Sequence, residues 1–82
     1  MTYFVYFIIS KVKKKTISYV GYTNNLERRL KLHNTNKGAK FTKGKKWKLA
    51  YYKTFKSKKE AMKQEYILKK NFKLRNQLKA II

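Results

Sequence analysis

The sequence predicts a single small α+β domain over residues 1–82, with the element order β-β-α-β-α-α. Its 82 residues are enough for one domain with a modest core. Three apolar segments have the composition and alternation of strands, and two capping signatures each precede a helical pattern. The hydrophobic content of 43% supports a globular fold despite the high charge. The absence of cysteine excludes disulfides and thiolate metal sites.

The first two strands are expected to form a hairpin. Residues 3–9 are an apolar run of aromatic and β-branched side chains, which is typical of a central strand buried on both faces. Residues 10–16 carry four lysines and are interpreted as the exposed turn. Residues 17–22 form the second strand, and alternation places one set of side chains on the same face: Ile17, Tyr19 and Gly21.

The first helix is predicted from a capping signature, Asn24 followed by Glu27. At about 100° per residue, Arg29 falls on the same arc as the apolar positions of this helix, whereas Arg28 points away. The sequence therefore predicts that Arg29 borders the buried face. His33 lies on that arc too, where a lone histidine is more often a core residue than a catalytic one.

A basic loop is predicted over residues 34–46, because two glycines and five lysines gather there. These lysines are suited to binding phosphates: Lys37, Lys40, Lys43, Lys45 and Lys46. Phe41 and Trp47 could stack on bases or anchor the loop, and the sequence leaves both readings open. Residues 47–55 form the third strand, in which alternation puts Trp47, Leu49 and Tyr51 on one face.

The second helix opens on a capping box, Ser57 with Glu60. A single stripe of this helix is predicted to face the sheet: Ala61, Glu65, Leu68 and Phe72. The pattern breaks near Asn71, and a final short helix is marked by Leu74, Leu78 and Ile81.

The net charge indicates a polyanionic partner. Twenty-three lysines and arginines face three glutamates, giving +20. A membrane surface is the rival partner, but the charge is spread over loops and faces rather than gathered on one amphipathic helix. Lysine-rich codon bias in the host contributes at most part of the excess, since it does not explain why acids are so few. With no apolar run of about 18 residues and no signal peptide, we expect a cytoplasmic chain without membrane association.

Two of the three carboxylates have a structural explanation, and elimination leaves the third as a candidate for a site. Glu27 lies in the first turn of its helix and Glu60 belongs to the capping box, so the helix ends account for both. Glu65 stands within an apolar stripe and needs a cation, a metal or strong donors. A salt bridge to a lysine remains an open alternative. Tyr6 and Tyr19 are equally open, since a strand tyrosine commonly packs in a core with its hydroxyl in water.

Taken together, several segments resemble the GIY-YIG nuclease domain over nearly the whole chain. The resemblance lies in Phe4-Val5-Tyr6, Tyr19-Val20-Gly21, residues 25–30 and residues 61–70. Residues 38–42 and 74–82 are most similar to the small stand-alone bacterial proteins of that family. The resemblance implies a three-stranded antiparallel sheet flanked by helices, and hydrolysis of DNA phosphodiesters with a divalent metal.

The resemblance also implies the residues of a site. Tyr6 matches the tyrosine proposed as general base or as the group that orients water, and Tyr19 the tyrosine near the scissile phosphate. Arg29 matches the catalytic arginine and Glu65 the metal-binding glutamate. Supporting roles fall to Gly21, where a side chain would obstruct the substrate, and to His33. Mg²⁺ or Mn²⁺ is the expected cofactor, and one carboxylate suits a single-metal site. Arg29, the metal and the basic surface are expected to favour the phenolate form of Tyr6.

Two positions depart from the family pattern: Phe4 replaces the glycine of the first motif, and Tyr22 stands where some relatives carry a lysine. We therefore expect a metal-dependent DNA endonuclease of low sequence specificity, with a role in DNA repair or recombination. RNA remains an alternative substrate. The alternative function is a non-catalytic nucleic-acid-binding module on a nuclease fold.

Overall fold

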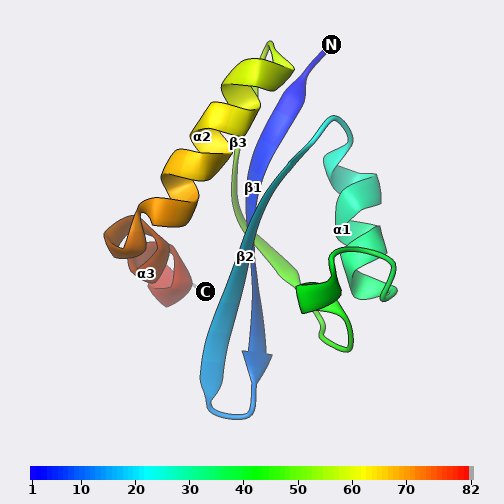
Figure 1. Ribbon diagram of the computed structural model, residues 1–82. Helices are drawn as coiled ribbons and strands as arrows, with labels where there is room; N and C mark the ends of the chain where they lie inside the picture. Colours follow the sequence, from blue (N-terminus) through cyan, green and yellow to red (C-terminus); the bar gives the residue numbers. More distant parts are fainter. Residues whose placement is uncertain (82) are drawn as a thin grey trace.

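The sheet lies between two groups of helices in a computed structural model that describes residues 1–81 (Figure 1). The elements are β1 (Tyr3–Val12), β2 (Lys15–Thr23), α1 (Leu26–Asn34), the 3₁₀ helix η1 (Lys40–Thr42), β3 (Lys48–Phe55), α2 (Lys58–Lys70) and α3 (Phe72–Ile81). The strands form an antiparallel sheet of order β2-β1-β3, which confirms the predicted fold class. The side chain of Ile81, predicted to mark the last helix, lies outside the described part, as does residue 82. No helix within residues 1–81 is long and apolar enough to cross a membrane.

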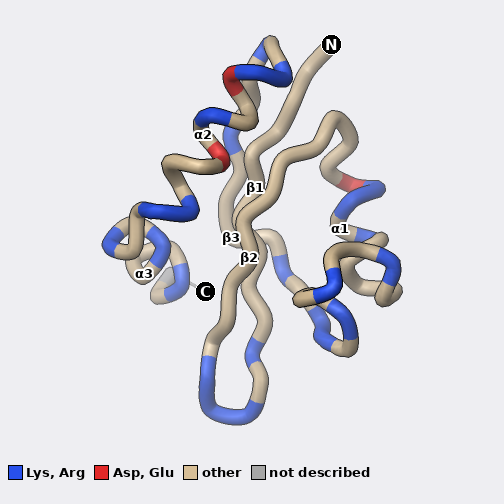
Figure 2. The backbone as a smooth tube through the Cα atoms, viewed as in Figure 1, with Lys and Arg blue, Asp and Glu red and all other residues tan. Residues whose placement is uncertain are grey.

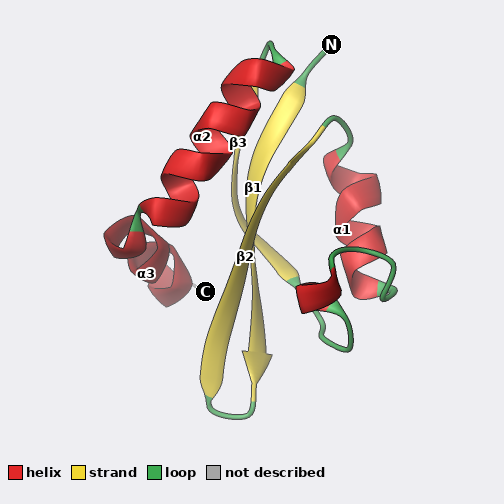
Figure 3. Cartoon of the chain, viewed as in Figure 1, coloured by secondary structure: helices red, strands yellow, loops and turns green. Residues whose placement is uncertain are grey.

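β1 is the central strand, and its side chains divide between two cores. Val5, Phe7 and Ile9 point to one face, where they pack with Ala61, Leu68 and Leu78 of α2 and α3. Tyr6 and Ile8 point to the other face, toward α1 and Trp47. Figure 3 shows α1 on one side of the sheet and α2 with α3 on the other. The continuous apolar run of β1 follows from this two-sided burial.

The hairpin between β1 and β2 is longer than predicted, because strand pairing continues into the lysine-rich segment. Val12 pairs with Lys15, so the turn contains only Lys13 and Lys14. Lys13 has a φ of 58°, as tight hairpin turns require at a central position. The hairpin projects beyond the helices and carries lysines at its tip (Figure 2).

β3 contains an irregularity that alternation does not predict. Tyr51 pairs with Phe7 and Leu49 pairs with Ile8, so Ala50 is an extra residue in β3. Leu49 and Tyr51 consequently pack in different cores, and the prediction that they share a face is wrong. Trp47 precedes the strand instead of beginning it.

Caps define the helix ends. Asn25, not Asn24, caps α1, and its side-chain oxygen accepts the Arg28 N–H at 3.1 Å. Ser57 caps α2 as predicted, accepting the Glu60 N–H at 3.1 Å. The chain turns at Asn71, whose side chain accepts the Leu74 N–H.

Because α2 ends at this turn, Phe72 belongs to α3. Its side chain is 69% exposed and is not part of the α2 stripe, so that prediction is wrong.

Candidate active site

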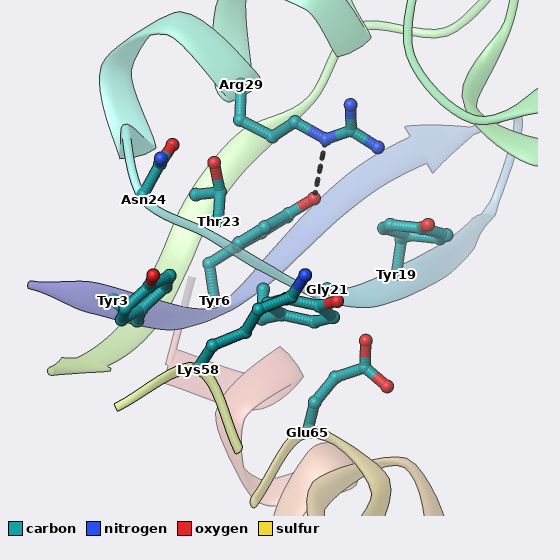
Figure 4. A pocket seen from close by; sticks show the side chains of 10 residues that line it. Tyr3, Tyr6, Tyr19, Gly21, Thr23, Asn24, Arg29, Lys58 and Glu65 are labelled. Carbon is teal, nitrogen blue, oxygen red and sulfur yellow. Dashed lines mark hydrogen bonds between the residues drawn. The ribbon is translucent and has the colours of Figure 1, made fainter. Parts of the chain in front are cut away.

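A cleft of about 510 Å³ opens along β2, one of the two edge strands, between α1 and α2 (Figure 4). Tyr6, Tyr19, Gly21, Arg29 and Glu65 all line it. These residues come from four elements, β1, β2, α1 and α2. Five further residues complete the lining: Tyr3, Tyr22, Thr23, Asn24 and Lys58. The side chains to which the sequence assigns the chemistry therefore face one space.

The strand register places the Tyr6 ring beside Gly21. The two residues pair directly across β1 and β2, so a side chain at position 21 would point to the same face as Tyr6. A Cβ atom there would lie 2.6 Å from Tyr6 Cζ and would collide with the hydroxyl. Gly21 thus makes room for the tyrosine itself, and because it also lines the cleft, its expected role of clearing a path for substrate stays a prediction.

Tyr6 is joined to a buried histidine. The Tyr6 Oη and His33 Nε2 atoms lie 2.8 Å apart, and His33 Nδ1 lies 2.9 Å from Thr42 Oγ1. The Thr42 hydroxyl donates its proton to the Ala39 carbonyl at 2.8 Å, so its oxygen accepts from His33 Nδ1–H. This network leaves His33 Nε2 as an acceptor, and the Tyr6 hydroxyl donates to it. His33 is fully buried behind Tyr6 and does not line the cleft.

The protonation states of this pair follow from burial. Desolvation raises the pKa of Tyr6 to about 12, and the hydrogen bond from Arg29 opposes the rise only partly. Burial, with the nearby Arg29 charge, lowers the pKa of His33 to about 4. At neutral pH the pair is a phenol and a neutral imidazole. Arg29 does favour the phenolate, as expected, because its hydrogen bond and its charge lower the pKa of Tyr6; desolvation outweighs both effects, so the hydroxyl keeps its proton at neutral pH.

Arg29 occupies the position that the helical arc predicts. Its Nε–H donates to Tyr6 Oη at 3.4 Å, and Figure 4 shows the guanidinium reaching over the cleft. The hydrogen bond to Tyr6 raises the pKa of Arg29, so its charge is permanent. Arg28 is exposed and does not line the cleft.

Tyr19 belongs to an aromatic cluster at one end of the cleft. Its ring centroid is 5.1 Å from that of His33 and 6.3 Å from that of Phe41, on which it stacks at 21°. Trp47 is buried and its indole N–H donates to the Thr42 carbonyl at 3.0 Å, which shows that Trp47 anchors the loop. Phe41 remains 52% exposed.

Glu65 forms an ion pair and still faces the cleft. Its Oε1 lies 3.2 Å from Lys69 Nζ, and the carboxylate side chain is 17% exposed. The salt-bridge alternative is therefore present, but it is an i,i+4 surface pair that contributes little to stability. No three His, Cys, Asp or Glu side chains gather within residues 1–81. A single accessible carboxylate fits Mg²⁺, which keeps several water ligands and shares others with substrate phosphates.

The basic loop lies beside the cleft without lining it. Lys37, Lys40, Lys43 and Lys46 are exposed, as phosphate contacts require. Lys45 is half-buried, because its ammonium donates to the Phe41 and Lys43 carbonyls and lies 5.3 Å from the Phe41 ring centroid. Figure 2 shows the lysines of this loop and of the hairpin tip as separate basic segments.

Sequence reasoning missed two residues that the structure brings to the site. Lys58 lines the cleft, and its spacing of three and seven residues from Ala61 and Glu65 was the available signal. Thr42 holds His33, nine residues before it, through a loop whose path no local pattern specifies.

Comparisons with known proteins identify the family of the chain. The model of the GIY-YIG catalytic domain family matches residues 2–79. The chain is 44% identical to the UPF0213 protein SH2523 of Staphylococcus haemolyticus over 77 residues, covering 93% of this chain and 92% of that protein. It is 47% identical to the UPF0213 protein CPE1444 of Clostridium perfringens, covering 79% and 70%.

The solution structure of the UPF0213 protein BH0048 of Bacillus halodurans is similar, with a TM-score of 0.50 and 36% identity. That match covers 94% of this chain and 80% of that one. The matched segment spans 60% of the Oceanobacillus iheyensis relative and 55% of the Bacillus licheniformis relative. The fold, the order of its elements and the match of residues 2–79 establish that this chain belongs to the GIY-YIG family and has its nuclease-type fold.

Proposed function

We propose that the protein is a metal-dependent endonuclease that hydrolyses DNA phosphodiester bonds. The observation that carries the proposal is the meeting of Tyr6, Tyr19, Arg29 and Glu65 in one cleft. A chain of net charge +20 supports a nucleic-acid substrate. Lysine contacts to phosphates do not distinguish one base from another, so the proposed activity has low sequence specificity. Such an activity suits a role in DNA repair or recombination, which would take place in the cytoplasm.

Tyr6 and His33 act together on the attacking water. A phenol of pKa about 12 holds its proton at neutral pH, but its hydrogen bond to His33 provides a path for that proton. As the water oxygen attacks phosphorus, a water proton passes to Tyr6 Oη and the Tyr6 proton passes to His33 Nε2. The P–O bond to the leaving oxygen breaks, and that oxygen takes a proton from solvent. Phosphate in the cleft favours the imidazolium, since a nearby anion raises a histidine pKa.

Arg29 stabilises the charge that builds on the phosphate. Its planar guanidinium presents donors that match two phosphate oxygens, and its hydrogen bond to Tyr6 fixes its direction. Tyr19 borders the same space and positions the phosphate against Tyr6.

Glu65 is the residue that would hold Mg²⁺ or Mn²⁺. Such an ion polarises the phosphate oxygens and lowers the pKa of bound water. The exposed lysines of the basic loop bind neighbouring phosphates on the DNA and set its direction across the cleft.

The test is nicking of plasmid, flapped and branched DNA in Mg²⁺ or Mn²⁺ by the wild type, Glu65→Gln and Glu60→Gln. Glu60 is an exposed carboxylate on the same helix and does not line the cleft, so it is the matched control. The wild type and Glu60→Gln should cut, and Glu65→Gln should lose about 10³-fold or more in rate. Equal cutting by all three proteins would refute the assignment of Glu65.

A second pair of variants tests the arginines. Arg29→Ala should lower kcat/KM by about 10²–10³-fold, as removal of a donor to a developing anion does, and Arg28→Ala should change it less than about threefold. Equal losses would contradict the role of Arg29.

The alternative is a module that binds nucleic acid without cutting it. It is favoured by one observation, the pairing of Glu65 with Lys69, which leaves the carboxylate already engaged. In the nicking experiment this function predicts that the wild type and Glu65→Gln bind equally and that neither cuts. The same reactions with a matched RNA show whether either function extends to RNA.

A further inference from the structure

We propose that Lys58 is a second phosphate-binding residue of the cleft, contacting a backbone phosphate of the bound strand on the side opposite Arg29. The inference rests on the proposed nuclease function and adds a substrate contact to it. Three observations carry it: the place of Lys58 on α2, the charges that line the cleft, and the absence of an acidic partner for its ammonium.

Lys58 lies on the stripe of α2 that faces the sheet. The stripe continues through Ala61, which is fully buried, and Leu68, which is 6% exposed. The positions 58, 61, 65 and 68 are separated by three, four and three residues, so they all lie on one side of the helix. Glu65 belongs to the same stripe, about 10.5 Å further along the helix axis. Lys59 is rotated by about 100° and points away from the cleft.

Among residues 1–81, two cationic side chains line the cleft, Arg29 and Lys58, together with one carboxylate, Glu65. Arg29 comes from α1 and Lys58 from the first turn of α2, so the two positive charges face the cleft from opposite walls. Figure 4 shows the Lys58 side chain extended toward β2, with Arg29 beyond the Tyr6 hydroxyl.

The Lys58 ammonium has no acidic partner within residues 1–81. The ion pair of α2 joins Glu65 to Lys69, which lies on the far side of Glu65 from Lys58. Without a carboxylate partner, the Lys58 ammonium is repelled by the positive charge of Arg29. An anion placed between the two cations would attract both of them. A backbone phosphate is such an anion, and a lysine binds it as a point charge.

The geometry assigns different tasks to the two cations. Arg29 is hydrogen-bonded to Tyr6, so the phosphate at Arg29 is the one that reacts. Lys58 lies on the opposite wall of the cleft from Arg29 and, unlike Arg29, makes no hydrogen bond with Tyr6. It therefore anchors the strand, and its loss should weaken binding more than it slows the bound complex.

The experiment compares Lys58→Ala, Lys58→Arg and Lys59→Ala with the wild type. Lys59 carries the same charge at the neighbouring position and is exposed, which makes it the matched control. Affinity for a short DNA duplex is measured without divalent metal over a range of KCl concentrations. Loss of one phosphate contact should reduce the slope of log K against log salt by about 0.9. We expect this change for Lys58→Ala and none for Lys59→Ala or Lys58→Arg.

Cleavage kinetics provide the second readout. Lys58→Ala should raise KM about tenfold and change kcat less than threefold, and Lys58→Arg should restore KM. A thermal melt of each variant controls for folding, since loss of the exposed ammonium should not change Tm.

The outcomes separate this inference from the nuclease proposal. If the wild type binds and cuts but Lys58→Ala and Lys59→Ala have equal salt slopes, the inference is wrong and the nuclease proposal stands. If the wild type binds but does not cut, the salt slopes alone decide the role of Lys58. If the wild type neither binds nor cuts DNA, both are refuted.

Discussion

The two walls of the cleft are built differently. On the α1 wall, Arg29, Tyr6, His33 and Thr42 form a continuous chain of hydrogen bonds with lengths from 2.8 to 3.4 Å. On the α2 wall, Glu65 makes one ion pair with a lysine whose side chain is 49% exposed, and Lys58 extends toward the cleft.

We expect the α1 wall to contribute to the stability of the fold, and the α2 wall to be free to bind a ligand. On the α1 wall, Tyr6, His33 and Thr42 are fully buried, so each depends on its partner, and removing one leaves another unsatisfied. Charged groups on the α2 wall reach water and keep the freedom to bind a metal or a phosphate. Changes to the α1 wall should therefore reduce both stability and activity, whereas changes to the α2 wall should leave stability almost unchanged.

The largest effect is expected for Tyr6→Phe. The change removes the donor to His33 Nε2, which should cost about 1–3 kcal/mol in free energy of unfolding and about 10²–10⁴-fold in cleavage rate. Tyr52→Phe is the control, because the Tyr52 side chain is 51% exposed and does not line the cleft, and it should leave stability and cleavage unchanged. Urea titration and a nicking assay give the two values. A Tyr6→Phe protein as stable as the wild type would break the distinction between the walls.

The pH dependence of stability should be set by the α1 wall. His33 has a pKa lowered from 6.5 to about 4, so the unfolded state binds its proton first and stability falls as pH drops from about 6.5 toward 4. The loss is up to about 3 kcal/mol, at 1.36 kcal/mol for each pKa unit. Tyr6 has the corresponding effect at alkaline pH. Its pKa is raised to about 12 in the folded protein, so stability falls as pH rises from 10 toward 12.

The measurement is straightforward, because the chain has one histidine. Its imidazole proton signals report a single titration by NMR, and denaturant unfolding at several pH values gives the stability. A His33 pKa near 6.5 in the folded protein would show that His33 is not buried as described.

A smaller effect is expected for Thr42→Val. This variant keeps the shape of the side chain but removes the acceptor for His33 Nδ1–H, which should cost about 1–2 kcal/mol of stability. Cleavage should slow about tenfold, because the histidine is no longer held in one tautomer. Thr54→Val, at an exposed position of β3, is the control for the substitution itself. Equal stability of the two variants would mean that the Thr42 contact does not hold His33.

The smallest effect should come from Lys69→Ala on the α2 wall. Loss of an i,i+4 ion pair at the surface should change the free energy of unfolding by less than about 0.5 kcal/mol. It also frees Glu65, so the Mg²⁺ concentration needed for half-maximal cleavage should not rise. If Lys69→Ala lowered the free energy of unfolding as much as Thr42→Val, the claim that the α1 wall contributes more to stability than the α2 wall would be wrong.

Local patterns predicted much of the fold and part of the site geometry. The strand periodicity of residues 3–9 and the caps of the helices depend on neighbouring residues, and these features agree with the structure within a few residues. The helical arc distinguished Arg29 from Arg28 because helix geometry alone sets which side chain faces inward. The catalytic roles stay predictions until the variants are measured.

Features that depend on distant segments could not be predicted. The extra residue Ala50 results from the register between β1 and β3, and the alternation of side chains within β3 alone gives no information about that register. The raised pKa of Tyr6 depends on burial by elements far along the chain, and the contact of Thr42 with His33 depends on the path of a loop.

That contact has a consequence for protein engineering. Residues 35–46 are a basic surface segment, and replacing it is an obvious way to try to alter the proposed nucleic-acid preference. Thr42 ties this segment to His33 through the contact with Nδ1, and Gly38 packs so closely on His33 that a Cβ atom there would collide with the ring. A graft from another protein would have to supply both residues in the same places, so diversification should be directed to the exposed lysines while the backbone of the loop is kept.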